Sequence, residues 1–266
     1  MIDEYLALLG VPRREPSLKY LFALHRAHVS RVPYTNVQIM RGNPASVDPC
    51  DAVRQILDGN GGYCFHLNGA FSWLLRELGF AITLHRGYAY RHGATSAELN
   101  HLALLAHDLD GDLDGKVWFV DAGLGDGLYE PLPLAAGHYR QGPFVYGLAF
   151  VDGLWRFTHD ETGSFAYLDL EPEAAAIGDF AEAHKRLSES PDSSFLRFLT
   201  SQVRFADRVC VMRGCTLTVL DAAGKRETVA MSASDFAAAY AEVCLSNVDD
   251  LWESTLAGHE QWLATL

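Results

Sequence analysis

The chain has 266 residues, 49% of them hydrophobic, and a formal net charge of −13 from 21 basic and 34 acidic side chains. This length and composition suit one large domain, or two or three small ones, with a sizeable buried core. The negative charge argues against nonspecific binding of nucleic acids or anionic membranes, so small molecules are the expected partners.

The start of the chain and its cysteines indicate where the protein works. Residues 1–4 are acidic, unlike the basic start of a signal peptide, and no apolar run approaches the length of a membrane span. The cysteines form neither an even disulfide framework nor a C-x-x-C metal pair. We therefore predict a cytosolic protein with reduced thiols and no metal site; the cysteines are Cys50, Cys64, Cys210, Cys215 and Cys244.

The first 81 residues carry the signals of a helical domain. Residues 3–9 are an apolar-rich turn that Gly10 closes, and Ser17 is a candidate N-cap for a helix that continues to about His28. Pro33 interrupts this pattern, so we expect residues 31–37 to be extended or turn-like. Another helix is predicted over residues 51–57.

Residues 60–68, NGGYCFHLN, contain the candidate nucleophile. The two glycines permit backbone angles closed to other residues. From Cys64 onward apolar residues recur at helical spacing until Gly79, so Cys64 should be the first residue of a helix. Unpaired amides at that end favour negative charge and a larger thiolate fraction. Judged from its position alone, Cys64 could equally be an inert cysteine of the core.

From residue 82 the hydrophobic period changes towards two, which predicts strands. Asp152-Gly153 between two of them is a strong hairpin signal. So many short strands favour a small barrel or a curled antiparallel sheet as a second domain, residues 82–190. The predicted strands are residues 83–91, 99–106, 116–121, 143–150, 154–159 and 165–170.

The last region, residues 191–266, mixes both patterns and is predicted to be an α/β domain. We expect a helix over residues 193–205, strands over 209–212 and 216–220, and a turn at Ala223-Gly224 back towards 228–231. Ser234 is the candidate cap of the next helix, and Asp249 or Asp250 opens the last one.

A cysteine nucleophile needs an imidazole to take its proton and an acceptor to orient that imidazole. His101 begins an apolar strand, and Asp121 ends the next strand at a glycine loop. If the two strands pair around a turn at residues 110–115, these side chains come near the same end of the sheet. His66 is the rival base, but a residue two positions from Cys64 in a helix points to the opposite side. Alternatively, His101 could be a structural histidine, and Asp121 could cap a turn.

Four segments together resemble the arylamine N-acetyltransferase family. Residues 61–68 resemble its cysteine motif, residues 100–102 its histidine strand, residues 120–125 its aspartate loop, and residues 32–37 an upstream segment. The resemblance covers nearly the whole chain. It implies an α+β fold with a helical N-terminal domain, a β-barrel middle domain and an α/β C-terminal lid, built on a core like that of cysteine proteases and transglutaminases.

The resemblance also implies a Cys64, His101 and Asp121 triad that uses acetyl-CoA or another acyl-CoA as donor. The acyl group would pass through an acyl-cysteine to an arylamine in a ping-pong cycle. From their motif positions, Tyr34, Phe65 and Leu124 are the predicted substrate-binding residues.

Four positions depart from the family pattern: Thr35, Asn60, His66 and Leu124. The family usually has glutamate at the first and arginine at the second. We hypothesise that Thr35 and Asn60 face one another, so that a neutral polar contact replaces an ion pair. Leu124 stands where phenylalanine is usual and could widen the acceptor pocket.

Other functions remain open on the sequence. An amide synthase of natural-product assembly would take its acyl group from an acyl carrier protein in place of CoA. A transglutaminase-like or papain-like hydrolase would use a similar triad on peptides. A non-enzymatic scaffold is the remaining alternative, and all three triad residues argue against it.

Overall fold

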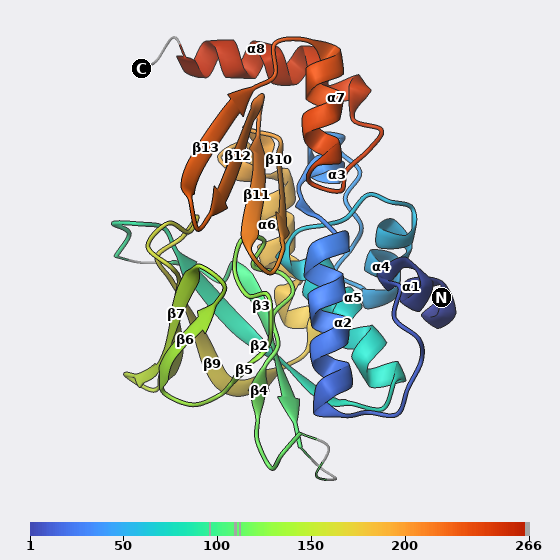
Figure 1. Cartoon of the computed structure of the whole chain (residues 1–266), viewed down its shortest axis with the longest axis vertical. Helices are drawn as coiled ribbons and strands as arrows, with labels where there is room; N and C mark the ends of the chain where they lie inside the picture. The colour runs from blue at the N-terminus through green and yellow to red at the C-terminus, as the bar shows by residue number, and fades with distance from the viewer. Residues whose placement is uncertain (96, 109–110, 112, 264–266) are drawn as a thin grey trace.

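The computed structural model of the chain describes residues 1–95, 97–108, 111 and 113–263. Figure 1 shows a bundle of helices beside a strongly curved sheet, with a smaller sheet and two helices above them. The candidate catalytic segments lie where the helices meet the curved sheet. Mixed helices and sheets with a barrel-like centre confirm the predicted α+β class.

The N-terminal helices follow the predicted order, and α5 is buried along most of its length. Helix α1 ends at Gly10, whose φ of 62° is left-handed, and the Ser17 hydroxyl accepts a bond from Tyr20 N that caps α2. Asp48 and Pro49 begin α4 slightly earlier than predicted. The helices are α1 (Ile2–Leu9), α2 (Leu18–Arg31), α3 (Val37–Met40), α4 (Pro49–Leu57) and α5 (Cys64–Glu77).

The middle region forms one antiparallel sheet of eight strands in the order β5-β4-β3-β2-β9-β8-β7-β6, which curls into a nearly closed barrel. At the β7–β8 hairpin, Asp152 and Gly153 both have positive φ, as the predicted two-residue turn requires. Two strands, β5 and β6, were not predicted. The strands are β2 (Ala81–Tyr90), β3 (His101–His107), β4 (Trp118–Phe119), β5 (Leu132–Pro133), β6 (Gly137–Gln141), β7 (Phe144–Val151), β8 (Leu154–Thr158) and β9 (Tyr167–Ala175).

Strands β3 and β4 pair as the sequence argument required. Leu105 lies opposite Phe119, and Val120 N donates to Leu104 O at 3.0 Å. This register continues towards His101 on one strand and Asp121 on the other. Residues 110 and 112 of the predicted turn lie outside the described residues.

The C-terminal region contains a five-stranded sheet in the order β1-β10-β11-β12-β13. Strand β1 (Tyr34–Thr35) comes from the helical part of the chain and pairs with β10, so this sheet joins the first and last regions. The other elements are β10 (Thr200–Arg204), β11 (Arg208–Arg213), β12 (Thr216–Asp221), β13 (Gly224–Val229), α7 (Ala233–Ala241) and α8 (Trp252–Leu263), with 3-10 turns at Ser194–Leu196 and Asp249–Leu251.

Three predictions for this region were wrong. The helix over residues 193–205 is a short 3-10 turn followed by β10, which pairs with a strand on each side. The strand expected over residues 228–231 is β13, which begins at Gly224. Ser232, not Ser234, caps α7, because its hydroxyl accepts a bond from Asp235 N.

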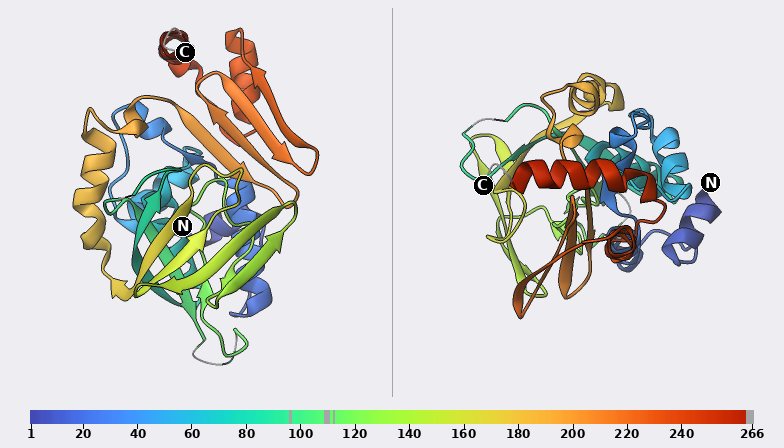
Figure 2. Two further views of the ribbon diagram at one scale, coloured as in Figure 1. Left: turned by 90° about the vertical axis from the view of Figure 1, so that its left-hand side faces the viewer. Right: turned by 90° about the horizontal axis from the view of Figure 1, so that it is seen from above.

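One further helix, α6 (Ala181–Glu189), follows a 3-10 turn at Ile177–Phe180 and was not predicted. Figure 2 shows it running along the outer side of the molecule, beside the barrel and towards the upper sheet. Within the described residues, no helix is both long and apolar enough to cross a membrane. The domain limits 1–81, 82–190 and 191–266 stay a prediction.

Candidate active site

Cys64 is the first residue of α5, as predicted. Gly61 has a φ of 58°, and a Cβ there would lie 2.4 Å from Pro33 O, so this turn requires glycine. The Cys64 side chain is buried, and its Sγ donates to Asn100 O at 3.4 Å. The first intrahelical bond runs from Leu67 N to Tyr63 O, so the preceding amides have no carbonyl within the helix to bind.

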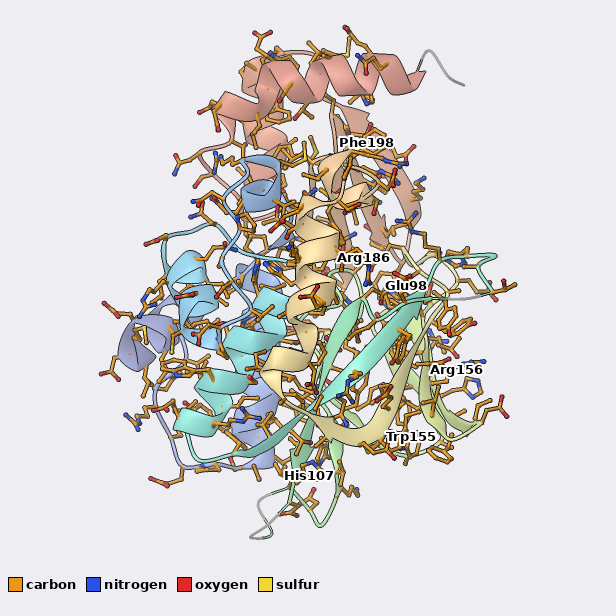
Figure 3. The ribbon with its side chains drawn as sticks, turned by 180° about the vertical axis from the view of Figure 1, so that it is seen from behind. Glu98, His107, Trp155, Arg156, Arg186 and Phe198 are labelled. Carbon is orange, nitrogen blue, oxygen red and sulfur yellow. The ribbon has the colours of Figure 1, made fainter. Side chains whose placement is uncertain are left out.

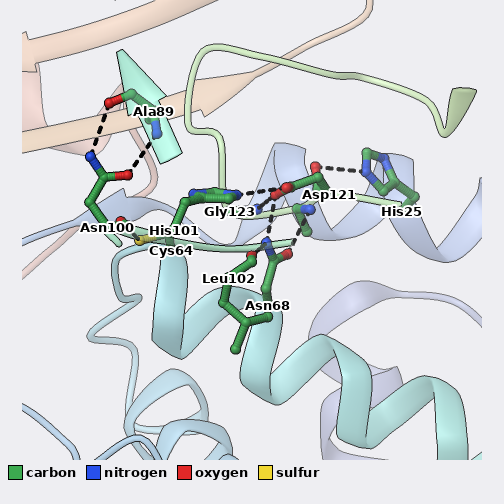
Figure 4. Close-up of polar contacts among 10 residues, drawn as sticks. His25, Cys64, Asn68, Ala89, Asn100, His101, Leu102, Asp121 and Gly123 are labelled. Carbon is green, nitrogen blue, oxygen red and sulfur yellow. Dashed lines mark hydrogen bonds and ion pairs between the residues drawn. The ribbon is translucent and has the colours of Figure 1, made fainter. Parts of the chain in front are cut away.

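His101 begins β3 and lies directly beside Cys64 (Figure 4). Its Nε2 is 2.7 Å from Asp121 Oδ2, and both side chains are almost completely buried. Gly87 lies opposite His101 in the β2–β3 ladder, and a Cβ there would be 3.0 Å from His101 Cβ. The structure therefore brings the three predicted triad residues together.

The electrostatics of the site favour a charged imidazole. Burial alone would lower the pKa of His101, but the Asp121 carboxylate and a hydrogen bond with the Cys64 sulfur more than offset it and raise the pKa to about 10. A protonated His101 ring beside the Asp121 carboxylate can act as a proton donor.

Asn68 positions Asp121, and the sequence analysis gave it no role. Its Nδ2 donates to Asp121 Oδ1 and to Leu102 O, both at 2.6 Å, while its Oδ1 accepts from Ala122 N at 2.9 Å. Asp121 Oδ1 also accepts from Gly123 N at 2.9 Å. Asn68 stands one helical turn after Cys64 on the same face, and this polar residue on an apolar stripe was the available signal.

Two more side chains hold the segments around the triad. Both polar atoms of the Asn100 amide bond to the backbone of Ala89, at 2.7 and 2.9 Å, which fixes the residue whose carbonyl accepts the Cys64 thiol. From α2, His25 Nε2 lies 3.1 Å from Asp121 O (Figure 4). Neither role was predicted. Asn100 bonds to a residue 11 positions away across the connection between β2 and β3, and the His25 contact joins positions 96 residues apart.

His66 is excluded as the base by its surroundings. Its Nε2 lies 2.8 Å from Ala45 O, and its Nδ1 lies 3.3 Å from Gln55 Nε2. Burial lowers the pKa of His66 to about 4. The ring therefore binds structural partners on the side of α5 away from His101.

The three predicted substrate-binding residues occupy different environments. Tyr34 is half-buried, and burial, then Cys64 and Asp126, raise its pKa well above the ordinary value, which indicates that its phenol is close to both groups. Leu124 is buried in the core of the barrel. Phe65 has no exposed surface, and its ring packs against Phe180 at a centroid distance of 5.6 Å. The structure therefore places Phe65 in the core.

The predicted contact between Thr35 and Asn60 was wrong. The Thr35 hydroxyl donates to Thr200 O at 2.9 Å and accepts from Val37 N at 3.3 Å. Its methyl group, Cγ2, is the atom that lies 3.0 Å from the Cβ position of Gly61. The Thr35 hydroxyl therefore stabilises the place where β1 pairs with β10.

A cavity of about 860 Å³ lies between the barrel loops and strands β11–β13. Asp126, which is close to Tyr34, is part of its wall. The cavity has an apolar part, formed by Pro143, Phe144, Phe198, Val211 and Leu220, and a polar part that includes Asp160, Ser164, Arg213, Thr218 and Lys225. Within the part of the chain that the structure describes, no group of three or more His, Cys, Asp or Glu side chains is placed to hold a metal ion.

Comparison with known proteins gives one consistent result. The profile of the N-acetyltransferase family matches residues 17–247. Human arylamine N-acetyltransferase 1 is 27% identical over 241 residues, covering 82% of each chain. An arylamine N-acetyltransferase/N-hydroxyarylamine O-acetyltransferase of Salmonella typhimurium is 30% identical over 183 residues, covering 65% of this chain and 63% of that protein.

Solved structures show the same fold. The arylamine N-acetyltransferase of Mycobacterium smegmatis superposes with a TM-score of 0.84 at 25% identity, covering 94% of each chain. The Mycobacterium marinum enzyme in complex with CoA gives a TM-score of 0.81 at 21% identity, covering 97% of this chain and 94% of that one.

Proposed function

Because this chain belongs to the arylamine N-acetyltransferase family, we propose that it moves an acetyl or other acyl group from an acyl-CoA to an arylamine through an acyl-Cys64 intermediate. One observation carries the proposal. The Cys64 thiol, the His101 ring and the Asp121 carboxylate form one buried chain of contacts. Nucleophilic catalysis by a cysteine needs these three groups in this order.

In the first half-reaction the Cys64 thiolate attacks the carbonyl carbon of the thioester. The unpaired amides at the start of α5 are the donors available to stabilise the negative charge that develops on the carbonyl oxygen. As the tetrahedral intermediate collapses, the bond between carbon and the CoA sulfur breaks, and His101 gives its proton to the departing thiolate. Acyl-Cys64 and free CoA result.

In the second half-reaction the amine nitrogen attacks the acyl-Cys64 carbonyl. His101, now neutral, takes a proton from the nitrogen, and Asp121 stabilises the imidazolium. The carbon–sulfur bond then breaks, which returns Cys64 to its thiolate form and releases the amide. An arylamine suits this step because its low basicity leaves it neutral and nucleophilic near neutral pH.

The cavity between the barrel and strands β11–β13 is the proposed place for the substrates. About 860 Å³ is the size of a pocket for a ligand larger than a simple aniline. Tyr34, close to both Cys64 and Asp126, would contact the acyl group or the amine. Leu124 and Phe65 would both act from the core, Leu124 by supporting the loop that carries Asp126 and Phe65 by fixing the start of α5.

A CoA donor is supported by the relative whose structure contains CoA. A cytosolic location is part of the proposal and agrees with five unpaired cysteines, which a reducing compartment maintains as thiols. Neither a metal nor an acyl carrier protein is needed for the steps described.

The test is the intact mass of the purified protein after incubation with acetyl-CoA and no acceptor. We expect wild type to gain one acetyl group and Cys64→Ala to gain none. Cys244→Ala is the matched control, because Cys244 is an exposed thiol far from the triad in sequence, and this variant should be acetylated like wild type. Addition of an aniline should then remove the acetyl group.

Two outcomes would contradict the proposal in different ways. If Cys64→Ala is acetylated as well as wild type, Cys64 is not the nucleophile. If wild type gains nothing while a haloacetamide still labels Cys64, acetyl-CoA is not the donor. Acyl groups on a carrier protein, and then peptide substrates, would be the next ones to try.

A further inference from the structure

Helix α6 lies between the two segments that carry the candidate catalytic residues. Figure 3 shows it from behind, running between the N-terminal helices and the barrel. Only Ala183 and Ser188 of its side chains are buried, so most of the helix does not contribute to the hydrophobic core. Its polar side chains nevertheless make specific contacts on two sides.

On one side, His184 contacts the segment that carries the nucleophile. Its Nδ1 lies 2.5 Å from the hydroxyl of Tyr63, the N-cap residue of α5, which directly precedes Cys64. The His184 ring also packs against Phe65 and His66, with centroid distances of 6.5 and 5.4 Å. Three residues around Cys64 therefore touch this one imidazole.

The protonation of this contact is defined by its surroundings. Tyr63 has no exposed surface, and burial, followed by the charges of Cys64 and Tyr34, raises its pKa well above the ordinary value. Burial also lowers the pKa of His184, against a smaller opposing effect of Glu189. The neutral phenol therefore donates to the unprotonated Nδ1 of a neutral His184.

On its other side, α6 contacts the segment that leads to His101. Arg186 donates to Leu99 O at 2.5 Å and pairs with Glu98 at 3.0 Å (Figure 3). Leu99 directly precedes Asn100, whose carbonyl accepts the Cys64 thiol. Residues two apart in a helix project about 200° from each other, so His184 and Arg186 reach opposite flanks of the site.

We propose that His184 is a positioning residue, which holds Tyr63 so that the Cys64 sulfur stays in hydrogen-bond contact with His101, and that Arg186 supports the same geometry from the His101 side. This inference rests on the roles proposed above for Cys64 and His101. The contact fixes the residue immediately before the nucleophile, where a small displacement moves the sulfur directly. The Arg186 pair is exposed to solvent, so its contribution is the smaller one.

The experiment measures how fast iodoacetamide alkylates Cys64 as a function of pH, and how fast acetyl-CoA acetylates it. The variants are Tyr63→Phe, His184→Ala, His184→Asn and the Tyr63→Phe/His184→Ala double variant. We expect Tyr63→Phe and His184→Ala each to slow both reactions by about tenfold near neutral pH, because small misplacements of reacting groups are costly. The pH midpoint of alkylation should rise in both, since the sulfur loses contact with the imidazolium.

Two comparisons separate positioning from a general loss of structure. The double variant should be no slower than either single variant, because both remove the same hydrogen bond. His184→Asn should recover most of the rate, since its side-chain oxygen can accept a bond near the Nδ1 position. Lys185→Ala, an exposed neighbour on the same helix, is the matched control and should behave as wild type.

Wild-type alkylation profiles for Tyr63→Phe and His184→Ala would overturn the inference. The inference would also be overturned if the rate losses of Tyr63→Phe and His184→Ala multiplied in the double variant. It would fail as well if His184→Asn reacted as slowly as His184→Ala. Alkylation needs neither CoA nor an amine, so these results decide the role of His184 even if no acyl transfer is found.

Discussion

Among the residues that the structure describes, two buried histidine–aspartate pairs have their aspartates five residues apart on one loop. His101 Nε2 lies 2.7 Å from Asp121, and His159 Nε2 lies 3.3 Å from Asp126. In each pair both side chains are at most 5% exposed. By burial and by contact, the two pairs look alike.

The groups around each pair are what differ. His101 also forms a hydrogen bond with the Cys64 sulfur, whereas His159 Nδ1 has no hydrogen-bond partner among the described residues. That nitrogen faces Gly163, where a Cβ would lie only 1.9 Å away. No nucleophile can reach it without displacing that backbone. A buried His–Asp pair therefore makes a catalytic base only when the second nitrogen faces a reacting group.

The residues that hold the two aspartates also differ between the pairs. Asn68, from the helix that begins with Cys64, holds Asp121, so this pair is tied to the proposed nucleophile. Ser164, from the loop between β8 and β9, holds Asp126 through its amide at 2.7 Å and its hydroxyl at 2.8 Å. The second pair therefore joins two barrel loops, and its expected role is structural.

The largest difference in activity between the two pairs is expected when each histidine is replaced. His101→Gln removes the proposed base and should lower kcat/KM for acyl transfer by about 10⁴-fold or more, as expected when a triad member is lost. His159→Gln should leave the rate close to that of wild type. Steady-state kinetics with acetyl-CoA and an aniline measure both, and similar losses in the two variants would show that the pairs share a function.

Replacing the aspartates should give the next largest contrast. Asp121→Asn keeps the shape of the side chain but removes the charge that supports the imidazolium, so kcat should fall by about 10³–10⁴-fold. Asp126→Asn should keep kcat near the wild-type value, with any effect of its place in the cavity wall confined to KM, and should lose about 1–3 kcal/mol of unfolding free energy, since one of its donors is left unpaired. Turnover and urea denaturation, measured on each protein, separate the two effects.

Replacing the anchoring residues should give a smaller contrast. Asn68→Ala frees Asp121 and should lower kcat by about 10–100-fold, because the triad loses its alignment while all three members remain. Ser164→Ala should lower the unfolding free energy by about 1 kcal/mol and leave kcat unchanged. If Asn68→Ala raises only the KM for the amine, Asn68 contacts the acceptor and does not position Asp121.

The sequence predicted one pair and not the other for a physical reason. The Cys64 helix and the hairpin that brings His101 near Asp121 follow from local periods and from one short-range pairing. His159 and Asp126 are 33 residues apart and meet through the closure of the barrel, which no local pattern encodes. The same applies to His25, whose contact with Asp121 joins positions 96 residues apart.

The wrong assignments in the C-terminal part have a similar origin. Apolar residues in 193–205 fit a helical period, but β10 is paired on both sides and buried over nearly its whole length, so its pattern does not alternate. Helix α6 escaped prediction because it buries only two side chains and contains few apolar residues. Ser232 was identifiable as a cap, since Asp235 follows it at capping-box spacing.

The two pairs are also expected to respond differently to pH. The pKa of His101 is raised to about 10, so its pair stabilises the fold below the unfolded value near 6.5 and loses this contribution as the pH rises through about 10. Burial would raise the pKa of Asp126, but His159 and Ser164 lower it below its ordinary value. Its pair stabilises the fold above that ordinary value and loses this contribution as the pH falls through the lowered pKa.

Urea denaturation across the pH range, with each variant compared with wild type, tests this opposition. The difference in unfolding free energy between wild type and Asp121→Asn should shrink on the alkaline side, and that between wild type and Asp126→Asn on the acid side. Each unit of pKa change corresponds to about 1.4 kcal/mol. If both differences shrink on the same side, the two histidines share one protonation state, and the contrast between a charged catalytic pair and a structural pair fails.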